Sequence, residues 1–153
     1  MSLIGELAPD FDLKDQHGSG WRLSAHHGRP VVLVFYPFAF TGVCTGELHE
    51  LRDDFVPSVA DTVEVVGLSC DSMFALRVFS ENEALNFPLL SDFWPHGEVA
   101  SAYGVFDEER GCARRGTFLI DADGVVRWSV VNNGPVARNV EEYRRALREL
   151  TAA

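Results

Sequence analysis

The sequence reads Pro37-Phe-Ala-Phe-Thr41-Gly-Val-Cys44 directly after the apolar run Val31-Val-Leu-Val-Phe35-Tyr36. The apolar run is long enough, and rich enough in β-branched residues, to predict a buried strand. Apolar residues then recur at helical spacing and predict a helix over 44–56. Cys44 is therefore expected where a central strand gives way to a helix N-terminus. Unpaired backbone N–H groups and the helix dipole favour a negative charge there, so the thiol is expected to react as its thiolate.

Composition limits the class of protein. A chain of 153 residues with 46% apolar content predicts one domain, 1–153, with a proper core. The net charge of −10 argues against nucleic acid and anionic membranes as partners. No apolar run approaches the ~20 residues of a membrane span, and the first residues lack the regions of a secretory signal. Three cysteines at wide spacing do not suggest a disulfide scaffold, so a cytoplasmic protein with reduced thiols is expected.

Strands alternate with helices along the rest of the chain, which predicts an α/β fold with a mixed central sheet flanked by helices. Pro57 is expected to end the helix that begins at Cys44. Asp71 or Ser72 is suited to cap the following helix. The other expected elements are an N-terminal β-hairpin (5–15 with 21–24), strands over 63–70 and 86–92, helices over 72–85 and from 98 to about 103, a hairpin of 116–121 with 125–131, and a last helix over 138–150.

The pattern Pro-x3-Thr-x2-Cys, here Pro37, Thr41 and Cys44, resembles the active-site motif of peroxiredoxins, cysteine peroxidases with a thioredoxin-like fold. The resemblance covers nearly the whole chain. The chain is most similar to the one-cysteine alkyl hydroperoxide reductase E subgroup, on the stretch Phe93-Trp-Pro-His-Gly97. Further landmarks of the family occur in the right order, namely Ala8-Pro-Asp-Phe11, Phe87-Pro-Leu-Leu-Ser-Asp92, Tyr103-Gly-Val105 and Arg115-Gly-Thr-Phe-Leu-Ile-Asp121.

The resemblance implies a role for each of five residues. Cys44 would be the peroxidatic cysteine, which attacks a hydroperoxide and becomes a sulfenic acid. Thr41 would place its hydroxyl beside the sulfur, and Arg115 would hold the thiolate and the peroxide oxygens with its fixed, charged fork. Pro37 would shield the sulfur from water, and Glu47 would orient the arginine. The reaction needs no cofactor, and the histidines show no metal-ligand spacing.

Some assignments have a plain structural alternative. Thr41 could serve only as an N-cap. Arg114, directly before Arg115, could be the arginine that acts on the thiol instead. Cys70 ends an apolar run and is expected in the core. Cys112 precedes Arg115 by three residues, so in a continuous strand it would point away from the active-site face.

The usual second cysteine of the family is missing, since His49 stands five residues after Cys44 and the C-terminal tail lacks cysteine. The resemblance therefore implies a one-cysteine mechanism, regenerated by an external thiol or a thioredoxin/glutaredoxin-like reductant. The chain is expected to reduce hydrogen peroxide and organic hydroperoxides, and to form a homodimer or higher homo-oligomer. A thiol-based redox sensor or relay remains an alternative. So does a thioredoxin-like disulfide oxidoreductase, although Glu47 occupies the place of its second cysteine.

Overall fold

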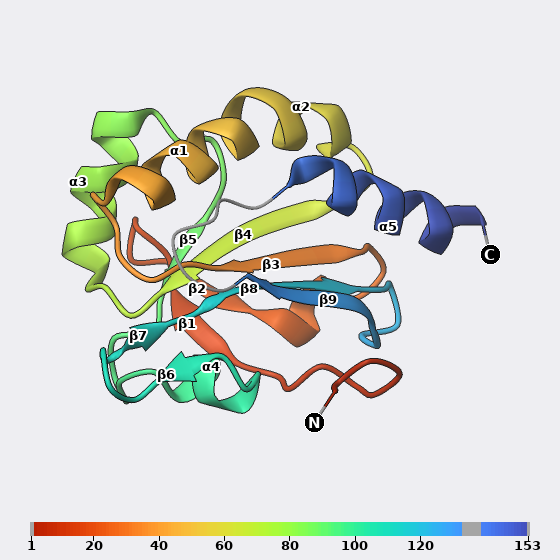
Figure 1. Cartoon of the computed structure of the whole chain (residues 1–153), viewed down its shortest axis with the longest axis horizontal. Coiled ribbons are helices and arrows are strands. Elements are labelled where there is room, and N and C mark those ends of the chain that lie inside the picture. The colour runs from red at the N-terminus through yellow and green to blue at the C-terminus, as the bar shows by residue number, and fades with distance from the viewer. Residues whose placement is uncertain (1, 133–138, 153) are drawn as a thin grey trace.

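The computed structural model describes residues 2–132 and 139–152. Its centre is a mixed seven-stranded sheet (Figure 1). The parallel strands β3 (Val31–Phe35), β4 (Glu64–Ser69) and β5 (Leu89–Ser91) lie in the middle. The antiparallel pair β8 (Arg115–Ile120) and β9 (Val126–Asn132) extends the sheet beyond β3. The predicted mixed α/β sheet is confirmed.

Helices cover both faces of the sheet because β3 is apolar on both. Val32 and Val34 face a core shared with the long helices, whereas Val31, Leu33 and Phe35 face a second core. The first face carries α1 (Gly42–Glu50), a π-helical turn η2 (Leu51–Phe55), α2 (Val56–Val59), α3 (Met73–Glu83) and α5 (Val140–Ala152). The short α4 (Glu98–Ala102) and the N-terminal segment cover the other face (Figure 1).

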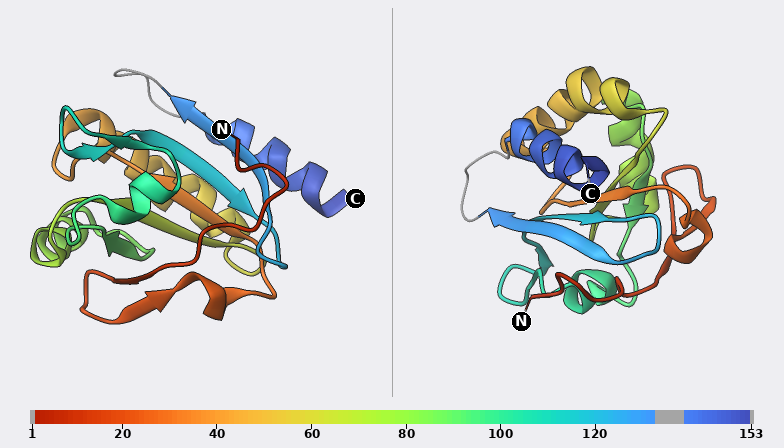
Figure 2. Two further views of the ribbon diagram at one scale, coloured as in Figure 1. Left: turned by 90° about the horizontal axis from the view of Figure 1, so that it is seen from below. Right: turned by 90° about the vertical axis from the view of Figure 1, so that its right-hand side faces the viewer.

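The N-terminal hairpin is present but shorter than predicted. Its strands are β1 (Asp12–Lys14) and β2 (Gly20–Arg22), and Lys14 pairs with Ser91 at the edge of the main sheet. The 3-10 turn η1 (Leu23–His26) follows. The residues before β1 instead follow the start of β9, where Gly5 N–H donates to the Val126 carbonyl at 2.8 Å. Both views of Figure 2 show this segment leaving the hairpin.

The expectation that Pro57 ends the first helix is wrong, because helical structure continues to Val59. The turn before Pro57 is a π-turn, in which Val56 N–H bonds to the Leu51 carbonyl. Such a turn is wider than an α-turn and gives the proline ring room against the preceding carbonyls. The π-turn therefore lets one long helical segment run from the active-site motif across the sheet.

A small hairpin, β6 (Phe106–Asp107) with β7 (Cys112–Ala113), was not predicted. It precedes β8 and lies at the end of the sheet where α1 begins (Figure 1). The strand does not continue unbroken from Cys112 to Arg115, since Arg114 N–H turns to the Val105 carbonyl at 2.6 Å. The strand alternation expected between Cys112 and Arg115 therefore does not apply. The predicted start of the last helix at Arg138 lies outside the described residues.

Candidate active site

The motif residues form the connection between β3 and α1. Pro37 is buried, and Thr41 takes the N-cap position of α1 with extended backbone angles. Phe40, just before it, has a positive φ of 69°, which is uncommon outside glycine and marks a strained turn. The turn is held to the end of β4, where Asp71 accepts the Ala39 N–H at 2.9 Å and the Ser69 hydroxyl at 2.7 Å. The connection thus delivers Cys44 in a fixed position in the first turn of α1.

Cys44 meets Arg115 in a closed environment. The Cys44 residue is 0% exposed and Arg115 is 8% exposed. Arg115 Nη2 lies 3.4 Å from Cys44 Sγ, and Nη1 lies 3.7 Å from it. Since little water competes there, the guanidinium interacts with the sulfur more strongly than an exposed arginine would. In this position the guanidinium can donate hydrogen bonds both to the sulfur and to an oxygen that the sulfur attacks.

Glu47 completes this buried active-site cluster, which we define as Cys44, Glu47 and Arg115. It lies one helical turn after Cys44 and is 6% exposed. Its Oε1 accepts from Arg115 Nη1 at 3.4 Å. One guanidinium nitrogen therefore contacts both the carboxylate and the sulfur, which fixes the plane of the arginine. The structure brings together three of the five predicted site residues through direct contacts.

Arg115, and not its neighbour Arg114, reaches the thiol. Arg115 is the first residue of β8, the strand beside β3, and its side chain is buried. Arg114 falls in the break between β7 and β8 and is exposed. The two positions thus differ in both burial and contact with Cys44.

Thr41 is arranged differently from the expectation. Its hydroxyl donates to the Phe38 carbonyl at 2.9 Å, and the side chain is exposed. It makes no side-chain cap bond, although Thr45 N–H bonds to the Thr41 carbonyl at 2.8 Å. The purely structural role of a side-chain N-cap is therefore not seen, and the described residues show no hydrogen bond from Thr41 to Cys44. A rotation about χ1 is needed to turn the hydroxyl away from Phe38.

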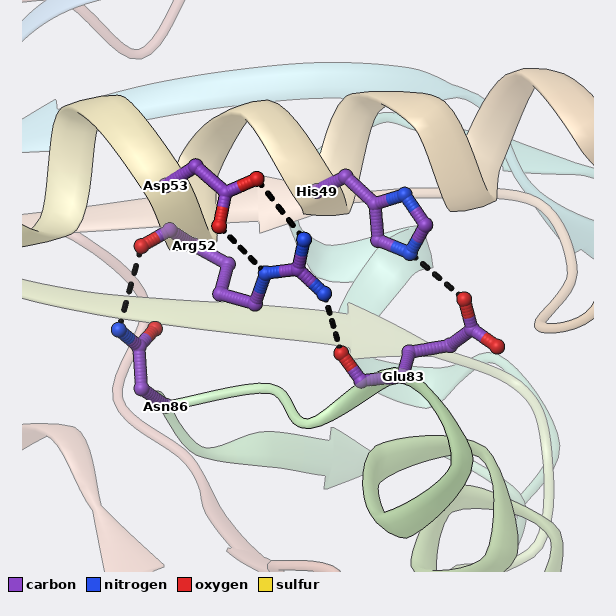
Figure 3. Close-up of polar contacts among 5 residues, drawn as sticks. All are labelled: His49, Arg52, Asp53, Glu83 and Asn86. Carbon is purple, nitrogen blue, oxygen red and sulfur yellow. Dashed lines mark hydrogen bonds and ion pairs between the residues drawn. The ribbon is translucent and has the colours of Figure 1, made fainter.

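A second polar cluster lies on the same helical segment, further from the motif (Figure 3). His49 Nε2 contacts Glu83 Oε1 at 2.6 Å, and Arg52 donates to the Glu83 carbonyl at 2.6 Å. Arg52 also forms a two-bonded pair with Asp53, and Asn86 donates to the Arg52 carbonyl at 3.2 Å. We call these five residues the surface clamp. It ties the end of α1 and the π-turn to the C-terminus of α3.

The two remaining thiols, Cys70 and Cys112, are buried, and within the described residues no arginine hydrogen-bonds either sulfur. Burial, with a smaller contribution from nearby Asp92, raises the pKa of Cys70 to about 12. Burial also raises the pKa of Cys112, while nearby Arg110 opposes this shift and Asp107 adds to it. Cys70 is a core residue as predicted, and both thiols are protonated at neutral pH. Neither has the electrostatic setting of a nucleophile.

No group of three or more histidine, cysteine, aspartate or glutamate side chains could hold a metal ion within residues 2–132 and 139–150. None of the described helices is long and apolar enough to cross a membrane.

A mixed sheet with a buried cysteine at the start of a helix, held by an arginine from the adjacent strand, defines a thiol-dependent peroxidase of the peroxiredoxin class. Comparison with known proteins gives the family. The sequence profile described as the AhpC/TSA family matches residues 4–129, and the chain belongs to this family.

The similarity to relatives covers nearly the whole chain. Alkyl hydroperoxide reductase E of Mycobacterium tuberculosis is 41% identical over 150 residues, which cover 97% of this chain and 98% of that protein. A selenocysteine-containing peroxiredoxin of Peptoclostridium acidaminophilum is 37% identical and covers 97% of this chain and 77% of its own length. The crystal structure of peroxidoxin BcpB from M. tuberculosis has a TM-score of 0.85 at 34% identity, covering 95% of this chain and 96% of that one. These matches confirm the predicted family and its thioredoxin-like fold.

Proposed function

We propose that the chain reduces hydrogen peroxide and organic hydroperoxides through Cys44. Cys44 Sγ contacts both terminal nitrogens of Arg115, at 3.4 and 3.7 Å in a buried site, and this contact supports the proposal most directly. The Cys44 thiolate attacks the terminal peroxide oxygen, the O–O bond breaks, and the departing alkoxide or hydroxide takes a proton. The products are an alcohol or water and a Cys44 sulfenic acid.

Each of the other candidate residues assists one part of this step. Arg115 donates to the peroxide oxygens while negative charge moves from sulfur to the leaving oxygen. Glu47 keeps Arg115 in the orientation in which the guanidinium reaches both the sulfur and the peroxide oxygens. Pro37 has no N–H to draw water towards the sulfur, and it is buried at the start of the motif. Thr41, after its hydroxyl turns from the Phe38 carbonyl, hydrogen-bonds the attacked oxygen.

We propose that an external thiol, free or in a thioredoxin/glutaredoxin-like protein, returns the sulfenic acid to the thiol. Three features support this one-cysteine route. His49, five residues after Cys44, is bound to Glu83, and no cysteine follows Cys112 in the sequence. Cys70 and Cys112 are buried thiols with raised pKa values, which makes them slow to attack a sulfenic acid.

Steady-state turnover tests the proposal. The double variant Cys70→Ser, Cys112→Ser should consume hydrogen peroxide catalytically with an added small thiol or glutaredoxin, at close to the parental rate. Cys44→Ser should be inactive. A double variant that stalls after one turnover while the parent cycles would show that a second internal thiol takes part. A parent that oxidises once and does not cycle with any thiol would favour a redox sensor.

We also propose that the protein is cytoplasmic and works as a homodimer or higher homo-oligomer. Two apolar side chains one turn apart on α3, Phe74 and Val78, are 67% and 50% exposed. Burial against a second copy would remove them from water. Light scattering on the eluting protein measures the mass, and a monomer at micromolar concentration would contradict the assembly.

A further inference from the structure

A small cavity of about 120 Å³ adjoins the active-site arginine. It lies where β7 leads into β8 and where β9 ends. Pro37 and Arg115 belong to its wall as well as to the active-site region. Asp107, Arg110, Ala113, Arg114 and Asn132 complete the lining. The guanidinium of Arg115 therefore links this cavity to Cys44 Sγ, 3.4 Å from its Nη2.

The lining is positively charged in a protein of net charge −10. It contains three arginines and one acid, Asp107. Asp107 Oδ1 already accepts the backbone N–H groups of Glu109 and Arg110. The guanidinium of Arg110 lies 5.9 Å from the centre of the Phe38 ring. Within the described residues, neither Arg110 nor Arg114 forms an ion pair with a carboxylate, so their charges remain available to a ligand.

Two buried polar atoms of the lining residues lack a hydrogen-bond partner in the described part of the chain. They are Nε of Arg115, a residue 8% exposed, and Oδ1 of Asn132. The two residues are direct partners in the β8–β9 register. An unpaired buried polar group costs about 1–3 kcal/mol, and a bound polar group recovers part of that. Since amide oxygen and nitrogen exchange places by a flip, Asn132 can present either a donor or an acceptor.

We propose that this cavity is a subsite for the carboxylate of an organic hydroperoxide whose O–O group reaches the Cys44 sulfur beside the Arg115 guanidinium. The inference rests on the proposed peroxidase function and names its preferred substrate class. A carboxylate offers two acceptor oxygens, which match the forked donors of Arg110 and Arg114. The cavity is too small for a long alkyl chain, so the carboxylate and the peroxide are separated by a short organic linker. Arg110 and Arg114 are positioning residues, since they bind the carboxylate end of the substrate and do not touch the O–O group or the sulfur.

The test compares two substrates with the same peroxide and linker, one carrying a negative charge and one neutral. One is a short tertiary-alkyl hydroperoxide carrying a carboxylate, and the other is its methyl ester. For the parent we expect kcat/KM to be about tenfold higher for the acid, and a tenfold preference corresponds to about 1.4 kcal/mol. The preference should fall to about one in Arg110→Gln, Arg114→Gln, and should weaken as salt rises. Arg22→Gln, the same change at the opposite edge of the sheet, should keep the parental preference.

Equal rates for acid and ester in the parent would overturn the inference, as would an unchanged preference in the double variant. A binding measurement separates this result from the peroxidase proposal. In Cys44→Ser, which cannot turn over, calorimetry should detect the hydroxy acid that corresponds to the reduced substrate. That binding should be lost in the background of Arg110→Gln, Arg114→Gln. Absent turnover with hydrogen peroxide in the parent would instead contradict the peroxidase function itself.

Discussion

Two polar clusters that share the helical segment beginning with α1 differ in their exposure to water. The buried active-site cluster of Cys44, Glu47 and Arg115 is nearly closed to water. The surface clamp pairs His49 with Glu83, and their side chains are 37% and 27% exposed. Charges interact strongly where water is excluded and weakly where it competes. The active-site cluster therefore combines a thiol with a buried cation, whereas the exposed pairs of the surface clamp serve to hold α1 against α3.

A thiol that is buried without a neighbouring cation should react very slowly with an alkylating reagent. This is the largest effect that we expect. The pKa of Cys70 is raised to about 12, so its thiolate forms only near that pH. At pH 8 the thiolate fraction of Cys70 is then about 10³ lower than that of an ordinary thiol titrating near ~8.5. Iodoacetamide followed by peptide mapping measures this, with the urea-unfolded protein as the control. Labelling of native Cys70 as fast as in urea would contradict the prediction.

Replacing the buried arginine should be the next largest effect. Arg115→Lys keeps the charge but loses the fork that reaches Cys44 and Glu47. We expect kcat/KM for hydrogen peroxide to fall by about 10²–10³, the usual cost of one preorganised donor. The matched control is Arg127→Lys, an exposed arginine on β9 that pairs with Asp121. An Arg115→Lys enzyme within about twofold of the parent would remove the arginine from the chemistry.

The two glutamates of the clusters give a direct comparison. Glu47→Gln removes the carboxylate partner of the buried Arg115 guanidinium. We therefore expect the free energy of unfolding to fall by about 1–3 kcal/mol. Glu83→Gln in the surface clamp should cost less than about 1 kcal/mol. Urea denaturation of both variants measures the difference. Equal losses would mean that burial does not set the strength of these pairs.

The smallest effect is expected at His49. His49→Gln removes the contact with Glu83 but leaves Arg52 bound to the Glu83 carbonyl. A partly exposed pair contributes about 0.2–1 kcal/mol to stability. Stopped-flow rates with hydrogen peroxide should stay within about twofold of the parent. A tenfold loss of rate would assign the clamp a part in the reaction.

The sequence pattern predicted the elements that carry Cys44 and Arg115, whereas the roles of Arg115 and Glu47 came from the family resemblance. A long apolar strand, a helix start at Cys44 and a hairpin beginning near Arg115 were all predicted, and the adjacency of β3 and β8 brings the two residues together. The position of Asn132 was not predicted. A bulge between Leu119 and Ile120 shifts the β8–β9 register by one residue, which places Asn132 opposite Arg115. Alternation in the sequence does not reveal such a shift.

Other features escaped prediction because they depend on tertiary contacts. The β6–β7 hairpin has strands of two residues, too short for any periodic signal. A proline in a helical pattern usually ends the helix, but the π-turn before Pro57 lets the helical segment continue. The surface clamp joins residues more than thirty positions apart, from His49 to Glu83. None of these leaves a local pattern in the sequence.

Cys44, and no other thiol of the chain, is expected to react with the peroxide. One equivalent of hydrogen peroxide is added to the reduced protein in the presence of a sulfenic-acid trap, and the peptides are mapped by mass spectrometry. We expect the trapped adduct on the Cys44 peptide, with Cys70 and Cys112 still reduced. An adduct on either of those two residues, or a disulfide joining one of them to Cys44, would contradict this expectation.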